Sequence, residues 1–151
     1  MILSAQSIRA RSGMIEPICE RGVIRGMSFG LSACGYDVRI AEHIRLERGA
    51  FVLASTIEHF DLPADVVGML CDKSTWARRG LSVFNTVAEP GWRGHLTLEL
   101  VNHGPETLIL WPGDPIGQMV FHRLDQPTDR PYAGKYQDQS KGPQSALEEQ
   151  S

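Results

Sequence analysis

Residues 73–78 (KSTWAR) are the part of the chain whose side chains are best suited to bind a small anion. Ser74 can cap a helical turn that runs through Arg78 and Arg79 and stops at Gly80. The free amides at the start of such a turn, with two hydroxyls and nearby cations, supply the donors and positive charge that a polyphosphate needs. An ordinary capped loop with solvated basic residues is the other interpretation, and spacing alone leaves both open.

Glu99 is the second candidate, because it lies in residues 95–101 (HLTLELV), which alternate with the period of a β-strand. The alternation predicts two faces, with Leu96, Leu98 and Leu100 on one and Thr97, Glu99 and Val101 on the other. If the second face lines a cleft, partial desolvation raises the carboxyl pKa toward the range useful to a general base. A solvated strand glutamate is the alternative.

Residues 126–151 form the third candidate, since Gln, Asp, Pro, Ser, Gly and Lys replace the apolar pattern there. The composition predicts a flexible C-terminal tail. Within it, residues 130–139 (RPYAGKYQDQ) combine tyrosines and amides with a glycine hinge, which suits a segment that closes over a ligand and excludes water. A tail that stays disordered is the alternative.

The elements that must position these residues are mostly short strands. One short helix is expected over residues 4–10, capped by Ser4 and ending near Gly13. β-forming side chains dominate residues 50–57, 66–70, 95–101 and 107–110. Pro and Gly mark turns at residues 61–65, 89–94 and 111–114. The pattern predicts one all-β domain over residues 1–125, a barrel or jelly roll.

Composition limits the partners and the chemistry. The net charge of -3 argues against a nucleic-acid polymer, which usually meets a basic surface. No apolar run approaches the roughly 20 residues of a membrane span, and the N-terminus lacks a secretion signal, so we expect a cytoplasmic protein without membrane contact. The three cysteines form no CxxC pair, and no HExxH or HxE…PCxxC signature accompanies the five histidines, so no metal site is expected.

Taken together and in order, these segments resemble the dCTP deaminase family, the deaminating branch of the dUTPase-like fold. The matching stretches are residues 36–40 (YDVRI), 73–81 (KSTWARRGL), 89–100 (EPGWRGHLTLEL), 112–118 (PGDPIGQ) and 134–139 (GKYQDQ). They are similar to the family's IDVRL-like strand, its [RK]SSLARLGL loop and its DPGFxGxITLEL hairpin. A glutamate within the hairpin strand, rather than an aspartate in the turn before it, favours the deaminases over dUTPases proper. The resemblance implies a distorted β-barrel or jelly roll with short helices and a mobile C-terminal tail.

The resemblance also implies roles for individual residues. Glu99 would be the general base for water attacking C4 of cytosine, without zinc. Ser74 would help hold that water, and Arg78 would orient Glu99 or reach a phosphate. The implied substrate-binding residues are Lys73, Thr75, Glu89, Gln118, Tyr132, Lys135 and Gln139. Mg²⁺ would arrive bound to the triphosphate, and the family's homotrimers imply active sites shared between chains.

Residues 84–91 (FNTVAEPG) depart from the family pattern H-x-T-A-x-x-I-D-P-G. About two residues are missing, Phe84 replaces the histidine, and Glu89 replaces the aspartate. The segment between Arg39 and Gly49 is also short. Three functions follow: deamination of dCTP to dUTP and ammonia, a bifunctional enzyme that goes on to dUMP and pyrophosphate, and a non-catalytic nucleotide-binding regulatory trimer.

Overall fold

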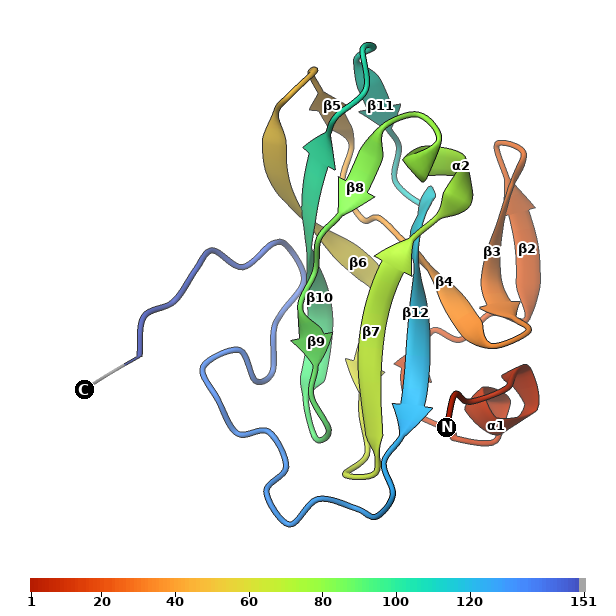
Figure 1. The fold of residues 1–151 in the computed structure, drawn as a ribbon, viewed down its shortest axis with the longest axis vertical. Helices are drawn as coiled ribbons and strands as arrows, with labels where there is room; N and C mark the ends of the chain where they lie inside the picture. Colours follow the sequence, from red (N-terminus) through yellow and green to blue (C-terminus); the bar gives the residue numbers. More distant parts are fainter. Residues whose placement is uncertain (150–151) are drawn as a thin grey trace.

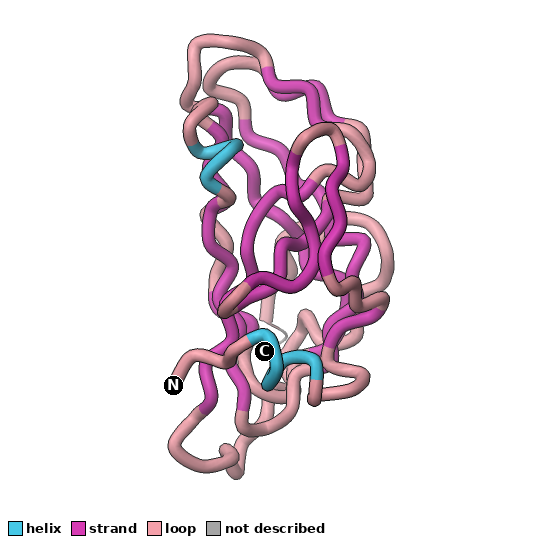
Figure 2. Tube along the Cα trace, turned by 90° about the vertical axis from the view of Figure 1, so that its right-hand side faces the viewer, coloured by secondary structure: helices cyan, strands magenta, loops and turns pink. Residues whose placement is uncertain are grey.

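Strands are the main regular secondary structure in the computed structural model of the protein, which describes residues 1–149 (Figure 1). The strands are β1 (Ile15–Glu16), β2 (Arg21–Ile24), β3 (Met27–Ser32), β4 (Gly35–Arg39), β5 (Ile44–Leu46), β6 (Phe51–Asp61), β7 (Val66–Asp72), β8 (Leu81–Val83), β9 (Val87–Ala88), β10 (Arg93–Asn102), β11 (Leu108–Leu110) and β12 (Pro115–Arg123). Two short helices, α1 (Ala5–Arg9) and α2 (Ser74–Ala77), lie toward opposite ends of the long axis (Figure 2). No helix in residues 1–149 is long and apolar enough to span a membrane.

The strands form a six-stranded sheet in the order β2-β3-β4-β12-β7-β9, a four-stranded sheet in the order β1-β6-β10-β8, and the pair β11-β5. All strand pairs within these sheets are antiparallel. The two larger sheets share a core, where Phe60 of β6 and Phe121 of β12 are fully buried with ring centroids 6.4 Å apart. The all-β prediction is confirmed, and the sheets stay open rather than closing into a barrel.

The two helices test the capping predictions. The Ser4 hydroxyl accepts a hydrogen bond from the Ser7 N–H and caps α1, as predicted. The prediction that Ser74 caps α2 is wrong, because Lys73 is the N-cap residue, without a side-chain bond, and Ser74 is the first helical residue. Gly80 follows the helix with a φ of +95°, and a Cβ there would lie 2.3 Å from the Gly104 nitrogen. A glycine is therefore required where this turn meets the loop after β10.

A β-bulge in β6 lies opposite Leu96 of β10. The register shifts between His95 and Thr97, where residues 56–58 of β6 stand opposite the single residue Leu96. Leu98 and Leu100 are fully buried in the core, as predicted. Leu96, predicted to share their face, instead lines the same pocket as Thr97 and Glu99.

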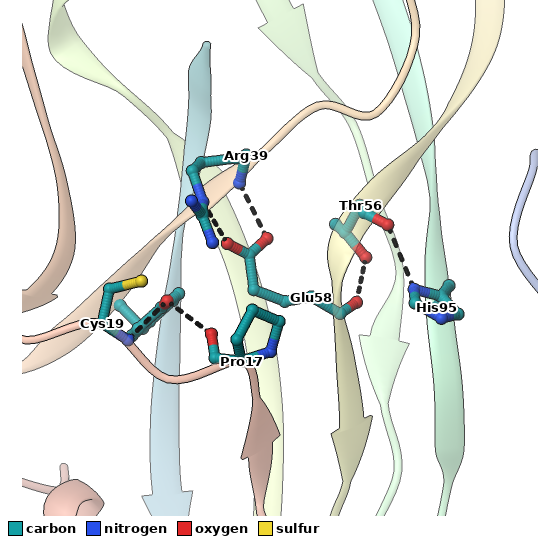
Figure 3. A network of polar contacts seen from close by, with 7 residues as sticks. Pro17, Cys19, Arg39, Thr56, Glu58 and His95 are labelled. Carbon is teal, nitrogen blue, oxygen red and sulfur yellow. Dashed lines mark hydrogen bonds and ion pairs between the residues drawn. The ribbon is translucent and has the colours of Figure 1, made fainter. Parts of the chain in front are cut away.

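A buried polar network links β4 of the six-stranded sheet to β6 and β10 of the four-stranded sheet, where β10 carries Glu99 (Figure 3). The fully buried carboxylate of Glu58 in β6 accepts hydrogen bonds from the Arg39 Nε at 2.7 Å and the Arg39 backbone N–H at 2.9 Å. The Thr56 hydroxyl donates to the Glu58 carbonyl, and the Thr56 carbonyl lies 3.2 Å from Nδ1 of His95 in β10. The network therefore fixes β4, β6 and β10 relative to one another.

Candidate active site

A pocket of about 750 Å³ lies along β10. Its walls come from β6, the segment 85–89, β10 and the C-terminal tail. The lining residues are Phe51, Leu53, Asn85, Thr86, Val87, Ala88, Glu89, Trp92, Leu96, Thr97, Glu99, Tyr132, Tyr136, Gln139, Gln144 and Ala146. An apolar hollow of this size with a few polar groups is typical of a small-molecule site.

Glu99 is half-buried in this pocket. Desolvation raises the pKa of its carboxyl above the ordinary value, since burial disfavours the charged form. Its Oε2 is buried, and within residues 1–149 it accepts no hydrogen bond. A half-buried carboxyl that lines a pocket and has one unpaired oxygen is the arrangement expected of a group that must bind and release a proton.

The backbone of Glu99 is held from the side of β8. The Phe84 N–H donates to the Glu99 carbonyl at 3.2 Å, and the Glu99 N–H donates to the Asn85 side-chain oxygen at 3.2 Å. The Asn85 side-chain nitrogen donates to the Thr97 carbonyl at 2.6 Å. Consecutive residues of the segment that departs from the family pattern therefore contact the strand on either side of Glu99.

The C-terminal tail forms one wall of the pocket. The Tyr136 carbonyl of the tail accepts a hydrogen bond from the indole N–H of Trp92 at 2.7 Å. The Gln144 N–H of the tail donates a hydrogen bond to the Thr97 hydroxyl at 2.9 Å. The Gln139 carbonyl accepts the His95 N–H at 2.9 Å. The tail of the chain thus runs beside the same strand that carries Glu99 (Figure 1).

The loop predicted to bind an anion, residues 73–78, lines a different hollow through its residues 76–78. Arg78, with Trp76 and Arg79 beside it, lines a space of about 670 Å³ against residues 104–109. The guanidinium of Arg79 lies over the Trp76 ring, 5.0 Å from its centroid. Neither Ser74 nor Thr75 lines the pocket of Glu99. Within a single chain, the residues predicted to bind phosphate and the predicted base are therefore separate.

Two further predicted substrate-binding residues have partners inside the chain. The Lys73 ammonium forms an ion pair with Asp37 at 2.7 Å, and both side chains are about nine-tenths buried. The Gln118 side-chain nitrogen donates to the Ser32 hydroxyl at 2.8 Å. Both residues are thus held by strands of the six-stranded sheet, and neither lines the pocket of Glu99.

The structure therefore brings together four of the predicted site residues and leaves six outside the pocket. Glu89, Glu99, Tyr132 and Gln139 line it. The six outside it are Lys73, Ser74, Thr75, Arg78, Gln118 and Lys135. In the tail, Lys135 forms an ion pair with Glu149, 3.2 Å away, which raises the pKa of its ammonium.

Sequence reasoning missed six polar or aromatic residues that line the pocket: Phe51, Asn85, Thr86, Trp92, Tyr136 and Gln144. Asn85 had a signal, since it stands in the segment that departs from the family pattern. The tail residues had only their composition. Among residues 1–149, no group of three or more His, Cys, Asp or Glu is arranged to hold a metal ion.

Comparison with known proteins identifies the family of the chain. The model of the dCTP deaminase-like family matches residues 33–124. A dCTP deaminase of Campylobacter fetus is 34% identical over 83% of this chain and 86% of its own length. A dCTP deaminase of Acidobacterium capsulatum is 34% identical over 87% of this chain and 90% of its own length. The aligned span with the first, 159 residues, exceeds the 151 of this chain, so that relative has extra residues inside the matched region.

Solved structures with a similar fold are dUTPases. The EIAV dUTPase superposes with a TM-score of 0.59 at 17% identity, over 81% of this chain and 98% of its own. The dUTPase of phage phi11 of S. aureus superposes with a TM-score of 0.58 at 18% identity, over 80% of this chain and 95% of its own. These neighbours establish the fold, and the family match and the curated relatives establish the branch. The chain has the fold of the dUTPases and belongs to the dCTP deaminase family.

Proposed function

We propose that this chain hydrolyses dCTP to dUTP and ammonia without zinc, with Glu99 as the general base. The similarity to dCTP deaminases over most of the chain supports the substrate and the reaction. The observation that carries the role of Glu99 is its carboxylate in the pocket, with one oxygen buried and unbonded within residues 1–149. A general base needs such an oxygen within reach of the water it activates.

In the proposed reaction Glu99 carries two protons in turn. It removes one from water as the water oxygen bonds to C4 of cytosine, and passes that proton to N3. It then moves the proton of the new C4 hydroxyl to the amino nitrogen, so the C–N bond breaks, ammonia leaves and C4 becomes the carbonyl of uracil. The raised pKa of Glu99 suits this shuttle, because a base with a pKa nearer the working pH accepts and returns a proton more readily.

A homotrimer with shared sites completes the proposal. Arg78 and Glu99 line different hollows in one chain, so a neighbouring copy is proposed to bring its residues 73–78 to the pocket of Glu99. There, Ser74 helps to hold the water, and Arg78 orients Glu99 or binds a phosphate. Thr75 donates its hydroxyl to the triphosphate.

The remaining contacts to the nucleotide are proposed to come from the sheet face and the tail. Gln118 lies beside the nucleotide and Lys73 binds the triphosphate once their present partners, Ser32 and Asp37, release them. Tyr132, Lys135 and Gln139 belong to the tail that closes over the nucleotide, and Glu89 contacts the sugar. Mg²⁺ enters as part of the substrate, bound to the phosphates and keeping its water ligands.

One assay tests this function and its alternatives. The full chain is incubated with dCTP and Mg²⁺, and dUTP, dUMP, pyrophosphate and ammonia are separated and measured. We expect dUTP and ammonia in equal amounts. Ammonia with dUMP and pyrophosphate would identify a bifunctional enzyme, and nucleotide binding without any product would identify a regulatory trimer and end the enzyme proposal.

The Glu99→Gln variant tests the base. Ammonia release should be abolished, because an amide cannot accept the proton, while nucleotide affinity stays within about tenfold, a change of about 1.4 kcal/mol. The matched control is Glu16→Gln, which changes an exposed strand glutamate outside the pocket and should keep wild-type turnover. Turnover in Glu99→Gln at the wild-type rate would remove Glu99 from the role of base.

A further inference from the structure

The side chain of Asn85 forms hydrogen bonds with the backbone of β10 at Glu99 and at Thr97. Pairing between β8 and β10 runs from Asn102 to Leu100 and extends one step further, through the bond from the Phe84 N–H to the Glu99 carbonyl. A continuing antiparallel strand would next offer a carbonyl and an N–H to β10. The Asn85 side chain supplies both groups, to the Glu99 N–H and the Thr97 carbonyl.

Because the Asn85 side chain takes the place of the next residues of a strand, the main chain can turn away from β10 there. The backbone groups of β10 at Glu99 and Thr97 stay hydrogen-bonded. After Asn85 the chain crosses to the other sheet, where Val87 and Ala88 pair with Met69 and Gly68 of β7. The crossing segment forms a wall of the pocket, and β10 stays hydrogen-bonded on both edges at Glu99. An asparagine carboxamide is suited to this, because it has a donor and an acceptor side by side.

We infer that Asn85 is a positioning residue, which holds Glu99 at the wall of the pocket through its two bonds to the strand, one at the Glu99 N–H and one at the Thr97 carbonyl. This inference rests on the proposed role of Glu99 as the base. Asn85 acts through the β10 backbone, and its carboxamide has both bonds occupied within the chain. The other titratable side chains lining the pocket in residues 1–149 are Glu89, Tyr132 and Tyr136.

The test compares Asn85→Leu, which keeps the size of the side chain but neither hydrogen bond, with Thr97→Val. The second variant keeps the Thr97 carbonyl that Asn85 bonds, and removes only the hydroxyl that Gln139 and Gln144 of the tail contact. With dCTP and Mg²⁺, Asn85→Leu should lower kcat about tenfold or more with KM changed by less than about threefold. Thr97→Val should affect KM more than kcat.

A second readout does not depend on turnover. In the chain labelled with ¹³C at glutamate carboxyls, the Glu99 signal is identified by its loss in Glu99→Gln. Asn85→Leu should move its titration down toward the ordinary glutamate range, because a released Glu99 can reach water. Thr97→Val should leave the titration in place. Asn85→Ser, which can form at most one of the two bonds, should shift the titration of Glu99 by an intermediate amount. It replaces Asn85→Leu in the test if that variant does not fold.

The results separate the two proposals. If the wild-type chain releases no ammonia, the proposed function fails, and the titration still decides whether Asn85 positions Glu99. A titration of Glu99 in Asn85→Leu that equals the wild type would overturn the inference. Equal kcat in an active, folded Asn85→Leu would overturn it as well.

Discussion

Glu99 combines two properties that oppose each other. Its carboxylate lies in an apolar pocket with a buried, unpaired oxygen, which costs folding free energy when the group is charged. The same desolvation raises its pKa, which suits a proton shuttle near neutral pH. A residue whose environment is poor for stability and good for proton transfer is typical of an active site.

Replacing this carboxyl should therefore change the pH dependence of stability. Because the pKa of Glu99 is higher in the folded chain, its contribution to stability is complete below the ordinary value of 4.5 and is lost as the pH rises through the raised value. Glu99→Gln cannot lose a proton. We expect its melting temperature to exceed that of the wild type by roughly 1–4 °C at pH 8, the range that up to about 1 kcal/mol produces in a chain of this size.

The comparison at low pH is the control for that prediction. Near pH 4 both chains have an uncharged group at this position, so the two melting temperatures should coincide. Calorimetry at both values measures the difference directly. A gap of the same size at pH 4 and pH 8 would show that the amide packs better for reasons unrelated to the charge of Glu99.

At the level of elements, β10 contacts almost everything that forms the pocket. β6 pairs with one edge, β8 and Asn85 with the other, and the tail contacts the strand near its start, around Gly94. Gly94 has a φ of +143°, and a Cβ there would lie 2.6 Å from the Gln139 nitrogen. The absence of a side chain is what allows the tail to approach this strand.

Gly94→Ala should therefore release the tail. We expect KM for dCTP to rise roughly three- to tenfold, because binding contributions from the tail are lost, and trypsin to cut more quickly after Lys135 and Lys141. Gly13→Ala is the control, since it also places a Cβ at a positive φ, but nothing lies within 4 Å of it. If both variants lose stability and neither changes proteolysis of the tail, backbone strain rather than tail contact explains the effect of Gly94→Ala.

The sequence predicted the elements better than their connections. The residues of β6, β7, β10 and β11 carry strong β-forming patterns, and the Ser4 cap follows from a local rule, so both could be predicted. The bulge of β6 opposite Leu96 could not, because it depends on how β6 pairs with β10, a partner distant in sequence. The role of Asn85 was also hidden, since a carboxamide replaces backbone bonds only when the partner strand is in place.

At the scale of the whole molecule, the separation of two hollows is the main result. Arg78 and Glu99 were predicted to act together, yet each lines its own space in one chain. The family resemblance supplied the explanation, a homotrimer with shared sites, which stays a prediction. The sequence of one chain contains no pattern that specifies which faces of two copies meet.

Mixing two inactive variants tests the shared site. Arg78→Ala and Glu99→Gln should each be inactive alone, and a 1:1 mixture allowed to exchange subunits should recover about a quarter of wild-type activity, because one in four neighbouring pairs then combines an intact Arg78 with an intact Glu99. Sedimentation of the mixture measures the oligomeric state. Trimers that have exchanged subunits and remain inactive would place both residues in a site built by one chain.

The bond from Trp92 to the tail has an optical consequence. The ring is almost fully buried, and its indole N–H ends on the Tyr136 carbonyl of the tail. The fluorescence of an indole shifts in wavelength with the polarity around the ring and with the partner of its N–H. The chain therefore contains its own spectroscopic reporter, in which the emission of Trp92 follows docking of the tail in real time and without any added label.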